Sequence, residues 1–167
     1  MPKRRAARIV AFQMLYAMSY TGQTLEEAAP LYATLEPNRR KSLPPFALEL
    51  AKVALERQAD FDARIAETLE HWRPERLAVT DRILLRLACA ELFDFPAIPP
   101  RVTLDEYIEL AREFGDEESW RFVNGVLDSI VKRSGIPLDP PEAAPAESQS
   151  PEADPGEPSP APPGEEL

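Results

Sequence analysis

Proline and glycine residues divide the first 135 residues of this chain into short segments, and each segment carries apolar residues at helical spacing. Pro74 separates two such segments, and the three prolines of residues 95–100 separate the next two. Because proline lacks an N–H donor and clashes with the preceding turn, a helix ends at each of these points. No alternation of apolar and polar residues is long enough to predict a strand. We therefore expect an all-α fold of about seven helices, covering residues 3–19, 24–35, 44–58, 60–72, 80–93, 103–115 and 116–133.

Two of these helices are expected to begin with a capping box, in which a threonine and a glutamate three residues later bond each other's backbone N–H groups. Thr24 and Glu27 form this pattern before the second helix, and Thr103 and Glu106 form it before the sixth. Gly115 is expected to end the sixth helix, because glycine is common just after helix C-termini. The capping boxes therefore set the predicted starts of two helices.

The last 32 residues have a different composition from the rest. Residues 136–167 hold eight acidic residues, no lysine or arginine, and ten of the nineteen prolines. These acids account for eight of the ten net negative charges, so residues 1–135 are close to neutral. Such a segment buries too little apolar surface to offset its ordering entropy. We expect a helical domain over residues 1–135 and a disordered acidic, proline-rich tail over 136–167.

The sequence offers little for catalysis, metal binding or cofactor binding. His71 is the one histidine and Cys89 the one cysteine, so neither a histidine cluster nor an intrachain disulfide is possible. Arg8 and Gln13 interrupt the apolar segment that a signal peptide would need, and no apolar run approaches the ~20 residues of a membrane span. We expect a cytoplasmic protein that is not an enzyme, needs no cofactor or metal and has no membrane partner.

The first helix has a second patterned face beside its expected core face. Its start is basic, and no acid occurs in the first sixteen residues. The expected core face holds Ala7, Val10, Ala11, Met14 and Met18. The other face holds Arg5, Ile9, Phe12, Gln13 and Tyr16, with Arg8 at its edge. Arginine pairs with phosphates and aromatic rings stack on unpaired bases, so this face suits RNA. The alternative is that it packs on another helix and its arginines pair with acids such as Asp81.

The last helix contains Asn124-Gly125, a pair that is more typical of turns. An interior glycine costs about 1 kcal/mol relative to alanine. The apolar stripe holds Trp120, Val123, Val126, Leu127, Ile130 and Val131, and the opposite face holds Arg121, Gly125, Asp128 and Lys132. Phe122 and Asn124 flank the stripe, where they suit base stacking and hydrogen bonding. Gly125 leaves room either for RNA or for a neighbouring helix, and both interpretations stay open.

Arg82 and Arg86 lie four residues apart in the fifth helix and repel each other unless they are paired. The favoured interpretation is a structural pair with Glu106 or Glu109 of the sixth helix. A phosphate contact is the alternative.

Three segments together resemble the NusB family of transcription antitermination factors: "RRAARIVAFQMLYAM", "DRILLRLACAELF" and "IPPRVTLDEYIELAREFGDEESWRFVNGVLDSI". Their order and spacing match the family over about residues 3–133. The resemblance implies two packed helical bundles without enzyme activity. It also implies binding of single-stranded boxA RNA in rRNA operon leaders, together with NusE, a small-subunit ribosomal protein. This complex acts on RNA polymerase against termination and supports rRNA maturation.

The resemblance also assigns candidate RNA contacts on this chain. They are Arg4, Arg5, Gln13, Tyr16, Asp81, Glu118, Phe122 and Asn124. The face analysis of the last helix adds Arg121. The NusE surface is expected on the second bundle. One alternative is a stand-alone RNA-binding module like that fused to rRNA cytosine methyltransferases. A second is a protein-binding helical adaptor, for example a homodimer that covers the RNA face. The acidic tail is a candidate competitor of RNA.

Overall fold

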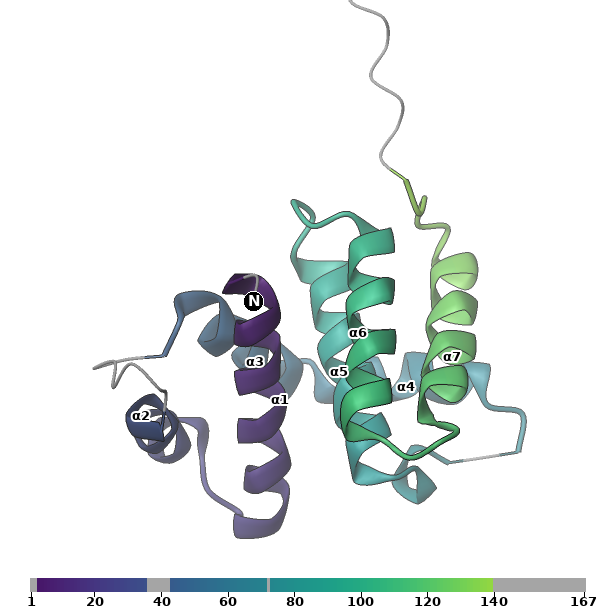
Figure 1. Ribbon diagram of the computed structural model, residues 1–167. Helices are drawn as coiled ribbons and strands as arrows, with labels where there is room; N and C mark the ends of the chain where they lie inside the picture. The colour runs from purple at the N-terminus through teal and green to yellow at the C-terminus, as the bar shows by residue number, and fades with distance from the viewer. Residues whose placement is uncertain (1–2, 36–42, 72, 140–167) are drawn as a thin grey trace, which may run out of the picture.

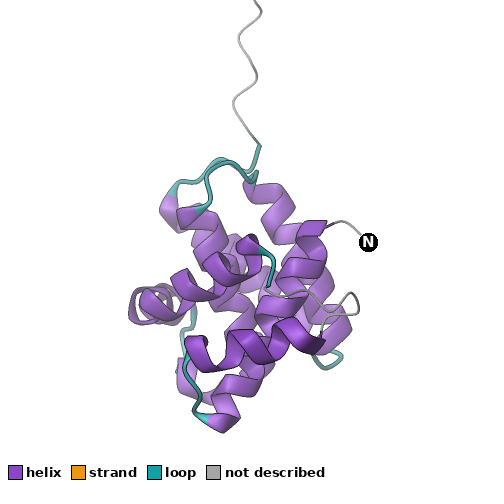
Figure 2. Ribbon diagram, turned by 90° about the vertical axis from the view of Figure 1, so that its left-hand side faces the viewer, coloured by secondary structure: helices purple, strands orange, loops and turns teal. Residues whose placement is uncertain are grey.

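The structure is a computed structural model that describes residues 3–35, 43–71 and 73–139. These residues form seven α-helices and one short 3₁₀ helix: α1 (Lys3–Thr21), α2 (Leu25–Leu35), α3 (Pro45–Glu56), α4 (Gln58–Thr68), η1 (Pro74–Arg76), α5 (Val79–Asp94), α6 (Pro100–Phe114) and α7 (Ser119–Ser134). Within the described ranges no strand occurs, and Figure 2 accordingly shows purple helices joined by teal loops. The predicted all-α class is confirmed.

The helices form two groups around α5. Figure 1 shows α1, α2 and α3 on one side and α4, α6 and α7 on the other. Helix α5 contacts α1 and α3 of the first group and α4, α6 and α7 of the second. A helix in this position must be apolar on most of its circumference. Accordingly, α5 buries Ile83, Leu84, Leu85, Leu87, Ala88, Cys89 and Ala90. The two-bundle fold implied by the resemblance is therefore present.

The ends of α2 and α7 follow the sequence signals. The Thr24 N–H donates to the Glu27 carboxylate at 2.9 Å, and the Glu27 N–H donates to the Thr24 hydroxyl at 3.3 Å. This confirms the first capping box. After α7, Gly135 has a φ of 65°, and the Ile136 N–H donates to the Val131 carbonyl at 3.2 Å. This six-to-one bond at a left-handed glycine is a common way to end a helix.

The second predicted capping box is wrong. Helix α6 begins one turn earlier, at Pro100, with Pro99 before it. Proline is well suited to the first position of a helix, because the N–H it lacks has no intrahelical partner there. Thr103 lies inside the helix, and its hydroxyl donates to Glu91 of α5 at 2.9 Å. Glu106 is bound by Arg5 of α1. Both side chains therefore hold helices together rather than capping one.

Two other predicted boundaries also shift. Helix α7 begins at Ser119 rather than at residue 116. The Asp116 carboxylate accepts the backbone N–H groups of Glu118 and Ser119, each at 2.9 Å, and so satisfies donors at the start of α7. Helix α4 ends at Thr68, four residues before the predicted end at 72. Aspartate before a helix is thus a start signal that the apolar spacing alone did not reveal.

A buried ion pair joins the two groups of helices. Arg8 of α1 is 2% exposed, and its Nε donates to Glu91 of α5 at 2.9 Å. Glu91 also accepts hydrogen bonds from Thr103 and Tyr107 of α6 at 2.9 and 3.2 Å. Such a network stabilises a fold only when its charges are paired and hydrogen-bonded, as these are. Arg8, predicted at the edge of an exposed face, is therefore part of the core.

The first residues after α7 pack on the body. Ile136 and Leu138 contact the hydrophobic core. The Leu138 carbonyl accepts the backbone N–H of Arg101 at 3.2 Å, and the Arg101 guanidinium binds Asp139 at 2.7 and 3.0 Å. The chain is thus anchored beside the start of α6 up to Asp139. Residues 140–167 lie outside the described residues, so the predicted disorder of the tail stays a prediction.

Candidate nucleic-acid interface

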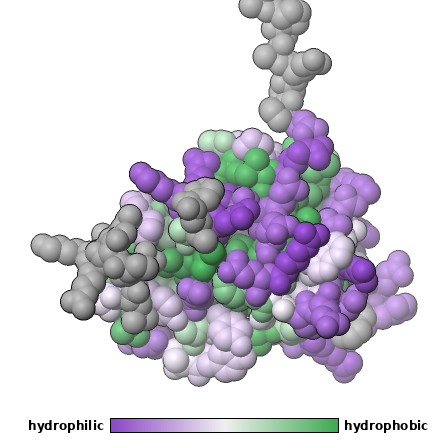
Figure 3. Space-filling model, viewed as in Figure 1, coloured by the Kyte–Doolittle hydropathy of each residue, from purple (hydrophilic) through white to green (hydrophobic). Residues whose placement is uncertain are grey.

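Two candidate RNA contacts of α1, Arg5 and Tyr16, lie along a seam between α1 and α6, and these two helices run in the same direction (Figure 1). Arg5 and Glu106 pair at one end of the seam, and the rings of Phe12 and Phe114 lie 4.9 Å apart at the other. Figure 3 shows apolar surface between the two groups of helices in this view. Since a helix rises 1.5 Å per residue, Arg5 and Tyr16 are about 16 Å apart along α1. That length suits a few nucleotides of an extended strand.

Three aromatic rings, those of Phe12, Tyr16 and Tyr20, form a ladder along the C-terminal half of α1. The Phe12 and Tyr16 centroids are 5.9 Å apart, and those of Tyr16 and Tyr20 are 5.2 Å apart. Tyr16 is 37% exposed and Tyr20 is 67% exposed, so both rings can accept a stacked base. Phe12 is 4% exposed and belongs to the core, which corrects its predicted place on the binding face.

A groove of about 390 Å³ lies beside this ladder. It is lined by Phe12, Gln13, Tyr16, Ala17, Tyr32, Thr80 and Phe114. The Gln13 side chain is exposed, and its backbone carbonyl accepts the Tyr32 hydroxyl at 3.2 Å. An amide beside exposed rings can hydrogen-bond the edge of a base that stacks on them.

A second hollow, of about 380 Å³, lies where α5 and α7 begin. It is lined by Arg76, Leu77, Ala78, Asp81, Asp116, Glu118, Ser119 and Phe122. Thr80 of the first groove and Asp81 of this hollow are consecutive, so the two depressions flank the first turn of α5. The structure thereby brings five candidate residues to one end of the molecule, although they belong to α1, α5 and the start of α7: Gln13, Tyr16, Asp81, Glu118 and Phe122.

Asp81 is the most unusual group in the second hollow. It is 8% exposed, and no described group donates a hydrogen bond to its buried Oδ1. Burial raises the pKa of its carboxyl above the ordinary value, and the negative charge of Asp116 adds to the rise, whereas Ser119 opposes it. A buried acceptor without a hydrogen-bond donor is costly to a fold. A carboxylate is the kind of group that accepts a hydrogen bond from the amino group of a base.

The arginines of the candidate site are mostly engaged with acids. Arg5 binds Glu106 through two hydrogen bonds, at 2.8 and 3.0 Å. This bond raises the pKa of Arg5 and lowers the pKa of Glu106. Arg121 lies 3.4 Å from Glu118 and stacks over Trp120. Arg4 is exposed and lies 5.8 Å from the Phe46 ring, without an ion pair among the described residues.

The predicted partners of the other arginines are wrong. Asp81, predicted as a partner for the arginines of α1, forms no ion pair with a described residue. Arg86 binds Asp62 of α4 through two bonds of 2.7 Å, rather than Glu106 or Glu109. Helical spacing places a side chain on a face, but it does not tell which neighbouring helix that face meets.

Comparison with known proteins decides the family. The model of the NusB family matches residues 5–132. This chain belongs to the NusB family. The transcription antitermination protein NusB of Solibacter usitatus is 41% identical over 142 residues, which is 84% of this chain and 97% of that protein. The NusB of Koribacter versatilis is 39% identical over 129 residues, covering 77% and 88%.

Solved structures of NusB proteins share the fold. NusB of T. maritima is 34% identical, with a TM-score of 0.67, over 79% of this chain and 92% of that one. A crystal structure of antitermination factors NusB and NusE in complex with dsRNA contains a chain that is 27% identical. Its TM-score is 0.67, and the match covers 80% of this chain and 99% of that one.

The structure answers the question raised by Asn124-Gly125 in this NusB-family chain. A Cβ atom added to Gly125 would have no heavy atom within 4 Å, so no described helix crosses there. Asn124 and Gly125 are both exposed, whereas Val123 and Val126 are buried as predicted. Packing against a described helix therefore does not explain the glycine, and the surface at Gly125 is open.

Four residues that line or border the groove beside Tyr16 were not predicted from the sequence: Tyr20, Tyr32, Thr80 and Phe114. Tyr20 carried a usable signal, because it lies one helical turn beyond Tyr16. The others lie on different helices, and only the packing shows that they meet. No group of three or more His, Cys, Asp or Glu side chains in the described ranges is arranged to hold a metal ion. None of the described helices combines the length and apolarity of a membrane span.

Proposed function

We propose that this chain is a transcription antitermination factor that binds single-stranded boxA-type RNA of rRNA operon leaders together with NusE. The observation that carries the proposal is the pair of depressions on either side of the first turn of α5, in a chain of the NusB family. In this role the chain is an adaptor in the RNA polymerase antitermination complex and supports rRNA maturation. The expected place of this activity is the cytoplasm, where transcription takes place.

The two depressions suit unpaired bases. Tyr16 and Phe122 offer ring surface for stacking, which contributes about 1–3 kcal/mol per base. Asp81 and Glu118 accept hydrogen bonds from base amino groups, and Gln13 reads a base edge from the other side. In a duplex the bases are already stacked and paired, so these contacts favour a single strand.

Phosphates bind at the basic end of the seam, at the start of α1. Arg4 is available there, Arg5 becomes available when it leaves Glu106, and Arg121 and Asn124 border the outer face of α7. Arg5 and Arg121 are held by acids in the free chain, and the salt-dependent part of RNA affinity grows with the number of phosphates neutralised. The chain alone should therefore bind RNA weakly, which is consistent with a need for NusE as a second binding partner.

The test compares boxA RNA, a scrambled strand and a boxA duplex, each with and without NusE. Fluorescence anisotropy should show strongest binding for the single boxA strand in the presence of NusE. Equal binding of all three RNAs, or no effect of NusE, would reject the proposal. Light scattering of the free chain should accompany the titration, because a homodimer that dissociates on RNA addition would identify the adaptor alternative.

A further inference from the structure

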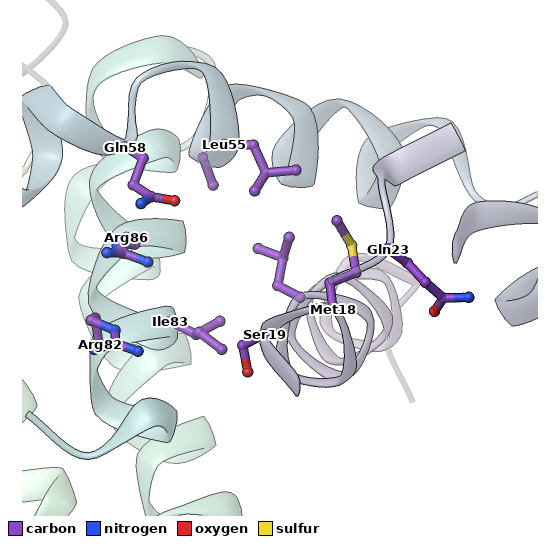
Figure 4. Close-up of a pocket in the computed structure, with 10 residues that line it drawn as sticks. Met18, Ser19, Gln23, Leu55, Gln58, Arg82, Ile83 and Arg86 are labelled. Carbon is purple, nitrogen blue, oxygen red and sulfur yellow. The ribbon is translucent and has the colours of Figure 1, made fainter. Parts of the chain in front are cut away.

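A cleft of about 290 Å³ lies outside the two depressions, between α1 and α3 on one side and α5 on the other. It is lined by Leu15, Met18, Ser19, Gln23, Ala54, Leu55, Gln58, Arg82, Ile83 and Arg86. Figure 4 shows Arg82 and Arg86 one above the other on α5, with Met18 and Ser19 of α1 across the cleft. None of the contacts proposed above uses this cleft.

The cleft carries unbalanced positive charge. Its lining contains two arginines and no acid. Arg86 is neutralised by Asp62 through two bonds of 2.7 Å. Arg82 forms no ion pair with a described residue, and its buried Nε has no hydrogen-bond acceptor. An anion bound at Arg82 would balance this guanidinium charge, which no described acid neutralises. The guanidinium fork is suited to binding phosphate through two hydrogen bonds.

The other walls of the cleft suit the remainder of a nucleotide. Met18, Leu55 and Ile83 offer apolar surface for a base or a ribose. The Ser19 hydroxyl donates to the Tyr16 carbonyl at 2.6 Å, so its oxygen is free to accept a hydrogen bond from a ribose hydroxyl. The Gln58 amide forms no hydrogen bond with the described residues and lies on the same side as Arg86 (Figure 4). A phosphate, a sugar hydroxyl and an apolar ring can thus be bound together.

The cleft continues the proposed RNA path. It shares the end of α1 and the start of α5 with the groove beside Tyr16, because Ser19 and Arg82 line the cleft while Tyr16 and Thr80 line the groove. Tyr20 extends the aromatic ladder beyond Tyr16 and is mostly exposed. A strand that stacks on the ladder therefore has a short route around the end of α1 into the cleft.

We propose that this cleft binds one nucleotide of the RNA strand beyond the Tyr16–Tyr20 ladder, and that Arg82 holds the phosphate of that nucleotide. The proposal rests on the proposed RNA-binding function and adds a contact to it. It gives a role to Arg82, which forms no ion pair among the described residues, whereas Arg86 of the next turn is paired with Asp62.

The first test compares Arg82→Gln with Arg133→Gln, in the full chain with NusE. Arg133 is exposed at the end of α7, and Ile136 just after it lies near Leu92 at the far end of α5. Both variants remove one positive charge. With boxA RNA extended by three nucleotides at each end, Arg82→Gln should weaken binding about tenfold. It should also reduce the slope of log affinity against log salt by about 0.7, the value for one phosphate contact to single-stranded RNA. Arg133→Gln should change affinity less than twofold.

Shorter RNAs locate the contact. With boxA RNA that lacks the extensions, Arg82→Gln and Arg133→Gln should bind equally well. If the two variants also bind the extended RNA equally well, the proposal that the cleft binds a nucleotide is overturned. The proposed binding of boxA RNA is not affected by that result. Failure of the unmodified chain to bind boxA RNA with NusE would instead reject the proposed function.

A second measurement avoids any effect of the substitution on folding. RNA with 4-thiouridine in the extensions is cross-linked to the unmodified chain with NusE, and the cross-linked peptides are identified by mass spectrometry. Cross-links from one extension to the end of α1 or the start of α5 are expected. Cross-links that map only to other surfaces would overturn the proposal.

Discussion

Arg5 and Glu106 form a two-bond ion pair across the seam between α1 and α6, at 2.8 and 3.0 Å. Arg5 is also a candidate phosphate contact, so the same guanidinium has an internal and an external partner. Glu106 in turn lies 3.7 Å from Arg8, whose main partner is Glu91. The carboxylate of Glu106 therefore holds Arg5 against the body and competes with RNA phosphates for it.

Glu106→Gln should strengthen RNA binding, because the substitution removes the competing charge and leaves Arg5 free. At low salt we expect about a three- to tenfold gain in affinity, or roughly 0.7–1.4 kcal/mol. The control is Glu109→Gln, which removes an equal charge from the same helix but breaks an ion pair with Arg112 and no hydrogen bond to Arg5. Fluorescence anisotropy over a range of salt concentrations measures both. A gain of equal size in the two variants would indicate a general charge effect and not release of Arg5.

The sequence alone predicted the helices and most of their core faces, because these follow from local periodicity. Val123, Val126 and Leu127 of α7 are buried as expected, and the Thr24–Glu27 capping box is formed. The prediction was wrong where a residue pattern that is typical of helix starts instead joins two helices. Thr103 and Glu106 have capping-box spacing, yet they bind Glu91 and Arg5 of other helices.

The candidate site was only partly predictable for the same reason. The exposed faces of α1 and α7 follow from their own sequences. That Thr80 of α5 and Phe114 of α6 meet Tyr16 depends on how the helices pack, and no local pattern encodes it. The burial of Arg8 is also a tertiary effect, since its carboxylate partner lies 83 residues away in the sequence.

Phe122→Ala should weaken RNA binding and cost modest stability. Phe122 is half-buried and lines the hollow at the start of α7, so about 1–2 kcal/mol of folding free energy should be lost, less than for a fully buried phenylalanine. Phe95→Ala is the matched control: Phe95 is also half-buried, but it packs on Phe46 away from the hollow. Thermal melting and RNA titration of both variants separate stability from binding. Equal loss of RNA affinity in the two would remove Phe122 from the interface.

Asp81→Asn should stabilise the chain at neutral pH and weaken RNA binding. Because burial raises the pKa of Asp81 in the folded state above its ordinary 3.8, folding is penalised wherever this carboxyl must be charged. The penalty is present at neutral pH and disappears as the pH falls through the folded pKa towards 3.8. We expect a gain of about 1 kcal/mol at pH 7.

Urea unfolding of the Asp81→Asn variant at pH 7 and near pH 4 measures this difference. The gain over the unmodified chain should shrink at the lower pH. RNA affinity should fall in the same variant, because a charge-assisted acceptor becomes a neutral amide. A variant that is less stable at pH 7 would show that Asp81 has a structural partner in the fold.

Arg8→Met should destabilise the fold strongly, because it leaves the Glu91 carboxylate buried without its cation. A loss of about 3–5 kcal/mol is expected. Adding Glu91→Gln should recover part of it, since the amide can still bond Thr103 and Tyr107 without a buried charge. Arg121→Met is the control, because its exposed pair with Glu118 should contribute at most about 1 kcal/mol. Losses that simply add in the double variant would show that Arg8 and Glu91 are not energetically coupled.

Removal of the tail after Asp139 should strengthen RNA binding at low salt. Asp139 is bound to Arg101, which precedes Glu106 by five residues, or about 7.5 Å along α6. The tail therefore begins near the Arg4–Arg5 end of the RNA path, and residues 140–167 carry seven acids and no lysine or arginine. A cut after Asp139 keeps Ile136 and Leu138 on the core, whereas a cut after Gly135 would remove them.

The truncated chain is compared with a full-length variant in which those seven acids are replaced by glutamine or asparagine. If the tail competes with RNA through its charge, both should bind boxA RNA more tightly than the unmodified chain at low salt. The gain should vanish at high salt, because exposed charges are screened beyond about 3 Å at 1 M. Unchanged affinity in both would identify a tail that takes no part in RNA binding. A gain on truncation alone would show that the tail acts through its bulk.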